Sequence, residues 1–120
     1  MPGKKQKLLL IEPDDAVRSA ISMLLESAGW RVCAFADAAH LAEDLDGFNP
    51  AVLVAEAELP DLRATGVLDL ARSHGVPVIF LGHGQQVQKA VDLMRMGARD
   101  FLEKPFPQGR LLDLLDSLRS

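Results

Sequence analysis

The sequence predicts a single α/β domain in which helices cover both faces of a five-stranded parallel sheet. Short, continuous apolar runs alternate with segments whose apolar residues recur at helical spacing, and this alternation occurs five times in 120 residues. The runs lack the in-out alternation of a half-exposed strand, as expected when helices cover both faces of a parallel sheet. A chain of this length can bury the core of one such domain without disulfides.

The first strand-helix unit shows the pattern most clearly. The apolar run 8–11 predicts a buried strand, and Pro13 ends it. Asp14 or Asp15 can cap the following helix, whose apolar residues follow the 3.6-residue period. Gly29 is a typical helix stop.

The rest of the chain repeats this alternation with shorter signals. Asp37 is the expected cap of the second helix, and a turn at 47–50 leads into the third strand. Apolar residues of the fourth helix share one stripe, formed by Val87, Ala90, Val91 and Met94. We expect strands over 30–36, 51–55, 76–81 and 100–103, and helices over 38–45, 66–73, 86–96 and 108–119.

Composition excludes several kinds of protein. A formal net charge of −4 argues against a nucleic-acid surface on this domain. No apolar run reaches the ~20 residues that cross a bilayer, and no signal-peptide core follows the first residues. The single cysteine, Cys33, lies in an apolar run and is interpreted as a buried hydrophobic residue. These features predict a cytoplasmic protein without membrane or direct nucleic-acid contact.

Four residues at predicted strand ends are candidates for a functional site. They are Glu12, Glu56, Gly82 and Lys104. Parallel sheets of this kind bind ligands beyond the carboxyl ends of their strands, so these positions are expected to meet at one edge. The three histidines lie far apart in the sequence without ligand spacing, which argues against a histidine metal site.

Several short motifs, in order and at ungapped spacing, extend over essentially the whole chain. They are residues 15–18, 26–29, 59–60, 97–101 and 102–106. With these motifs the chain resembles a response-regulator receiver domain, the CheY-like module of two-component signalling. The resemblance implies a flavodoxin-like sheet of order 2-1-3-4-5. It also implies that residues 1–120 are one receiver domain, expected to be the N-terminal part of a longer transcription regulator.

The resemblance assigns a role to each strand end. In the family, two acidic residues after strand one help to bind Mg²⁺, and an Asp after strand three accepts phosphate from a histidine kinase. A Ser or Thr after strand four and a Lys before Pro bind the phosphoryl oxygens. Here Glu12 keeps the first acid, Pro13 replaces the second, Glu56 replaces the acceptor, Gly82 replaces the hydroxyl residue, and Lys104 is retained.

These departures leave three interpretations of the pocket. Loss of the second carboxylate weakens Mg²⁺ binding, so no cofactor is expected. Glu56 can then pair with Lys104 as a built-in mimic of the phosphorylated state, or the pair is a partly exposed remnant of a lost function, stabilising by ~0–1 kcal/mol. The third interpretation is a working phosphoacceptor in which Asp14 joins the metal site.

A rival from another class is an enzyme or nucleotide-binding domain on the same type of sheet. Against this, the chain lacks Gly-rich phosphate fingerprints, since Gly82-His83-Gly84 does not match a P-loop. That segment is interpreted as a flexible loop in preference to an anion-binding nest. We therefore expect a regulatory, non-enzymatic module.

Three further expectations come from the resemblance. The Lys104–Pro105 bond is expected to be cis, as is usual in the family. Phe101 is the family's aromatic switch, and its ring is expected to point inward because Gly82 leaves space. The surface of the fourth helix, fifth strand and fifth helix is expected to bind an output domain or a second copy, through Lys89, Arg95, Arg99, Asp100, Leu112 and Leu115.

Overall fold

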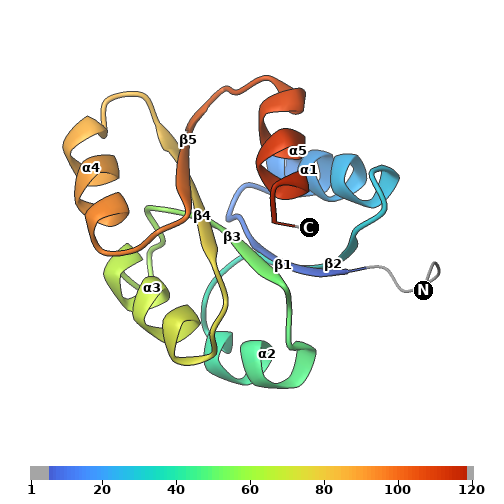
Figure 1. Cartoon of the computed structure of the whole chain (residues 1–120), viewed down its shortest axis with the longest axis horizontal. Helices are drawn as coiled ribbons and strands as arrows, with labels where there is room; N and C mark the ends of the chain where they lie inside the picture. The colour runs from blue at the N-terminus through green and yellow to red at the C-terminus, as the bar shows by residue number, and fades with distance from the viewer. Residues whose placement is uncertain (1–5, 119–120) are drawn as a thin grey trace.

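The computed structural model describes residues 6–118, which form a parallel five-stranded sheet between two layers of helices (Figure 1). The strands are β1 (Lys7–Ile11), β2 (Arg31–Phe35), β3 (Val52–Glu56), β4 (Val78–His83) and β5 (Asp100–Lys104). Their order is β2-β1-β3-β4-β5, with every pair parallel. The predicted fold class and strand order are confirmed.

The helices divide between the two faces of the sheet. They are α1 (Asp15–Ser27), α2 (Leu41–Phe48), α3 (Ala64–Ser73), α4 (Val87–Arg95) and α5 (Gln108–Asp116). Helices α1 and α5 cover one face, whereas α2, α3 and α4 lie on the other (Figure 1). Successive β1 residues serve opposite cores: Leu8 joins the cluster beneath α1 and α5, and Leu9 joins the cluster on the other face. This explains the continuous apolar runs.

The ends of α1 follow the prediction. The Asp14 carboxylate accepts a hydrogen bond from the Val17 backbone N–H at 3.0 Å, as an N-cap. Gly29, just beyond the helix, has a φ of 97°, which favours glycine. Most other predicted boundaries lie within two residues of those observed. Residue 119, the predicted end of the last helix, lies outside the described residues.

The predicted start of α2 is wrong. The helix begins at Leu41 after His40, and not at Ala38 after an Asp37 cap. The Asp37 carboxylate accepts a hydrogen bond from the Ala39 backbone N–H at 3.0 Å, in a turn that precedes the helix, and the Ala38 N–H donates to the Asp61 carboxylate at 3.1 Å. Because that partner is distant in sequence, local capping signals did not predict it.

The apolar stripe of α4 lies on an exposed side of the helix. Val87 and Met94 are 70% and 43% exposed, and Val91 is exposed as well. Leu93 is the one buried residue of α4. Periodicity correctly placed the stripe residues on one side, but it could not show that this side faces away from the core.

Helix α5 corrects one predicted interface residue. Leu115 and Leu111 are fully buried against the sheet, so Leu115 does not belong to a contact surface. Leu112, Leu114 and Leu118 are half-buried at the edge of the same cluster. No helix formed by residues 6–118 has the length and apolar character needed to cross a bilayer.

Candidate functional site

The carboxyl edge of the sheet carries a shallow pocket of about 300 Å³. Its lining comes from the ends of β1, β3, β4 and β5 and the start of α1: Glu12, Pro13, Asp14, Val17, Glu56, Glu58, His83 and Lys104. Three of the four predicted strand-end residues, Glu12, Glu56 and Lys104, therefore meet there. The parallel pairing of β1 with β3 explains this meeting, because it brings Ile11 opposite Ala55 and places the following glutamates side by side.

Lys104 bridges two buried carboxylates. Its Nζ donates a hydrogen bond to Glu56 Oε2 at 2.5 Å and another to Glu12 Oε1. Glu12 and Glu56 are 2% and 5% exposed, the only buried charged residues in the described part of the chain. The predicted Glu56–Lys104 pair is present, but it is buried and shared with Glu12 instead of being partly exposed.

The environment of Lys104 favours its charged form. Burial acts to lower the pKa of Lys104, but hydrogen bonds and charge attraction from Glu12 and Glu56 outweigh burial and raise its pKa above 10.5. Lys104 is therefore cationic throughout the physiological pH range. Its ammonium group is already committed to two carboxylates.

The donor set of the pocket differs from a magnesium site. Mg²⁺ requires near-octahedral oxygen coordination, and in this structure Glu12 and Glu56 each direct one carboxylate oxygen to Lys104. Pro13 has no side-chain donor, and the Asp14 carboxylate caps α1. Within residues 6–118, no three His, Cys, Asp or Glu side chains are arranged to hold a metal ion. The residues present do not fit the ion.

Two side chains lie close to the bare Cα of Gly82. A Cβ at Gly82 would overlap the tip of the Phe101 ring and the amide oxygen of Gln86. The Phe101 ring is half-buried and packs against the core, which agrees with the inward position predicted for it. The Lys104–Pro105 peptide is cis, also as predicted.

Gln86 and Glu58 are site residues that the sequence analysis missed. Gln86 Oε1 accepts a hydrogen bond from the His83 backbone N–H at 3.0 Å, and Gln86 Nε2 donates to Glu58 Oε1. The Gln86 side chain therefore contacts the backbone of the Gly82-His83-Gly84 loop, and the flexibility of this loop stays a prediction. The available signal was a long amide side chain four residues after the strand-end residue Gly82.

The predicted interaction residues occupy different surroundings. Lys89 lies 3.8 Å from Glu58 and lines a groove beside α3, so it points toward its own domain. Arg95 and Arg99 are exposed. The Asp100 carboxylate accepts a hydrogen bond from the Phe101 backbone N–H at 2.7 Å, and Leu112 is half-buried.

Comparison with known proteins settles the family. The sequence model of the response regulator receiver domain matches residues 8–116. The chain belongs to this family. Its relatives include the transcriptional regulatory protein FixJ of Bradyrhizobium diazoefficiens, 35% identical over 116 residues that cover 94% of this chain and 56% of FixJ. Another is the C4-dicarboxylate transport transcriptional regulatory protein DctD of Pseudomonas aeruginosa, 38% identical over 89% of this chain and 24% of DctD.

Solved structures agree with the family assignment. Full-length FixJ from B. japonicum is 31% identical, with a TM-score of 0.87 over 97% of this chain and 58% of FixJ. A receiver domain from Bermanella marisrubri is 25% identical, with a TM-score of 0.87 over 98% of this chain and all of its own. The 120-residue chain of the present structure thus spans 56% of the length of FixJ and 24% of the length of DctD. Its family is one of signalling proteins that includes transcription regulators.

Proposed function

We propose that this receiver domain acts as a regulatory protein-interaction module that does not depend on aspartyl phosphorylation. The observation that supports it most is Lys104, whose ammonium group binds the buried carboxylates of Glu12 and Glu56. In a receiver this lysine serves an incoming phosphoryl group. Here Glu56, at the acceptor position, supplies a negative charge to it without a kinase or a metal.

The charge of the pocket also supports this proposal. The pocket is lined by four acidic residues, Glu12, Asp14, Glu56 and Glu58. Among the lining residues within 6–118, Lys104 is the only Lys or Arg. An incoming phosphoryl dianion would meet this acidic excess at low effective dielectric, where repulsion between like charges is large. Phosphoryl transfer relies on Mg²⁺ and cationic side chains to neutralise that charge. We propose accordingly that Mg²⁺ binds weakly or not at all.

We expect no saturable response when Mg²⁺ and then beryllium fluoride, a phosphoryl mimic, are titrated to millimolar concentration. Amide NMR resonances of Glu12, Glu56, Gly82 and Lys104 would stay in place, because Lys104 and both glutamates already satisfy one another. A receiver domain with an aspartate acceptor serves as the positive control. Saturable shifts that extend to α4 would establish the alternative, a working phosphoacceptor with an unusual acceptor residue.

The partners that we propose are those of a response regulator. FixJ and DctD are named as transcriptional regulatory proteins, and this chain matches only part of each. We propose that the domain is the N-terminal part of a longer cytoplasmic regulator and acts on its output domain, with a histidine kinase as a second partner. The domain itself is proposed to be non-enzymatic.

We propose that a second copy of the chain binds at the surface of α4, β5 and α5. The exposed stripe of Val87, Val91 and Met94 supplies apolar area next to the exposed Arg95 and Arg99. Val91→Asp is expected to shift sedimentation from dimer toward monomer, because it places a charge in the apolar centre of the contact. Met23→Asp, at an exposed apolar residue of α1, is the control. Self-association that is equal in both variants, or absent from the parent chain, would refute this surface.

A further inference from the structure

Helix α4 is held to the domain by little apolar packing. Leu93 is its one buried residue, whereas α3 buries four side chains: Ala64, Val67, Leu68 and Ala71. Since apolar burial is the main force that docks a helix, the position of α4 depends more on polar contacts than that of α3 does.

Those polar contacts lie at both ends of α4. At its start, Glu58 accepts a hydrogen bond from Gln86 and lies 3.8 Å from Lys89 Nζ. At its end, the Arg72 guanidinium of α3 donates to the Met96 backbone carbonyl at 2.6 Å. Charge-assisted hydrogen bonds of this kind are stronger than neutral ones.

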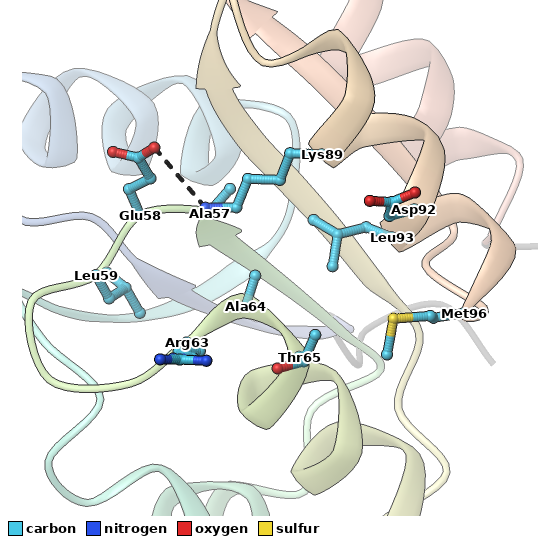
Figure 2. A pocket seen from close by; sticks show the side chains of 10 residues that line it. All are labelled: Ala57, Glu58, Leu59, Arg63, Ala64, Thr65, Lys89, Asp92, Leu93 and Met96. Carbon is cyan, nitrogen blue, oxygen red and sulfur yellow. Dashed lines mark ion pairs between the residues drawn. The ribbon is translucent and has the colours of Figure 1, made fainter.

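Between these contacts, a groove of about 510 Å³ separates α4 from α3 and the loop that follows β3. Figure 2 shows the Glu58–Lys89 pair reaching across one end of the groove, with Leu93 and Ala64 facing each other further along and Met96 at the other end. The groove leaves open space on the inner side of α4.

The contacts at the start of α4 connect to the acceptor position. Glu56 Oε1 accepts a hydrogen bond from the Glu58 backbone N–H at 3.4 Å, while Glu56 Oε2 binds Lys104. The side chain of the same residue, Glu58, accepts a hydrogen bond from the Gln86 amide. Gln86 Oε1 in turn accepts a hydrogen bond from the His83 backbone N–H. A continuous set of polar contacts thus joins Lys104 to the first turn of α4.

We propose that Glu58 and Gln86 form a latch that holds the first turn of α4 in place and joins it to Glu56. The latch replaces the hydroxyl residue absent at Gly82, and the bare Cα of Gly82 makes room for the Gln86 amide. This inference rests on the proposed function. If phosphorylation does not control the domain, contacts within the domain must hold α4 in the position that a partner recognises.

Amide hydrogen exchange of the whole 120-residue chain, measured by NMR without Mg²⁺, tests the latch. Gln86→Ala is expected to speed exchange at Ala90 and Val91 roughly three- to tenfold, the effect of losing one ordinary hydrogen bond. Gln88→Ala is the matched control, since among residues 6–118 the Gln88 amide binds the exposed Asp92 of the same helix. Exchange in β3 should be equal in both variants. Equal α4 exchange in the two variants, or faster exchange throughout β3, would overturn the proposal.

A double-mutant comparison tests the connection to Glu56. Glu56→Ala is expected to shift α4 amide resonances in the parent chain and to leave them in place when Gln86→Ala is also present. Equal shifts in both backgrounds would overturn the coupling. Because no phosphoryl mimic is added, these outcomes are independent of the Mg²⁺ and beryllium fluoride titration. The titration tests phosphorylation-independent behaviour and these exchange and shift measurements test the latch, so failure of the one is distinguishable from failure of the other.

Discussion

Replacing Lys104 with Met is expected to lower the free energy of unfolding by about 3–5 kcal/mol at pH 7. Lys104 is the cation shared by Glu12 and Glu56, which are 2% and 5% exposed. Without it, two buried carboxylates face each other with no compensating charge. Urea unfolding followed by circular dichroism measures the loss.

Two controls separate this effect from a general loss of lysine. Lys89→Met removes a more exposed pair at 3.8 Å from Glu58 and is expected to cost about 0–1 kcal/mol. Glu56→Gln leaves Lys104 paired with Glu12, and its cost is expected to stay near that of one hydrogen bond, about 0.5–1.5 kcal/mol. If Lys104→Met lowers the free energy of unfolding no more than Lys89→Met does, the charges of Lys104, Glu12 and Glu56 are hydrated in solution.

The pH dependence of the Lys104 effect follows from the direction of its pKa shift. Because the folded protein raises this pKa above 10.5, the folded state binds the proton more tightly than the unfolded state does. The stabilisation is fully present below the pKa that Lys104 has in the unfolded chain. It is lost as pH rises through the higher pKa that Lys104 has in the folded protein. The difference in the free energy of unfolding between the parent chain and Lys104→Met should therefore be constant from pH 7 to pH 9 and become smaller only in strong alkali.

Leu115→Ala is expected to destabilise the domain by about 2–5 kcal/mol, as truncations of fully buried leucines do. Leu115 is completely buried on the side of α5 that packs against the sheet, one helical turn after Leu111. Leu112→Ala, at the half-buried edge of the same cluster, is expected to cost roughly 1 kcal/mol because less area leaves water there.

The comparison of these two leucines distinguishes core from surface. Both were expected on an interaction surface, and urea unfolding of the two variants measures how far that expectation fails for each. Equal losses would place Leu112 in the core as well. A small loss for Leu115→Ala would return Leu115 to the surface of α5 and contradict the packing described above.

The predictable part of the fold came from local patterns. Buried parallel strands need continuous apolar runs, so the run 8–11 identified β1 without any partner being known. Asp14 was recognisable as a cap because its partner, the Val17 N–H, is three residues away. Strand ends are also local features, which is why Glu12, Glu56 and Lys104 could be named as site residues.

The errors arose where a distant contact decided the outcome. Before α2, the Ala38 N–H binds Asp61 of another loop, a contact that the local capping pattern did not reveal. The exposure of Val91 depends on how α4 is placed over the sheet, and periodicity carries no information about that placement. Likewise, Leu112 and Leu115 have the same chemistry, and only packing separates them.

For this protein, the sequence by itself determined the receiver fold and the residues at its strand ends. Only the tertiary structure decided how these residues combine. It showed that Lys104 binds Glu12 as well as Glu56, and that Gln86 reaches Glu58 beside Gly82. The physical reason is that propensity and periodicity depend on near neighbours. Burial and charge pairing depend instead on residues that are distant in sequence and meet only when the sheet has formed.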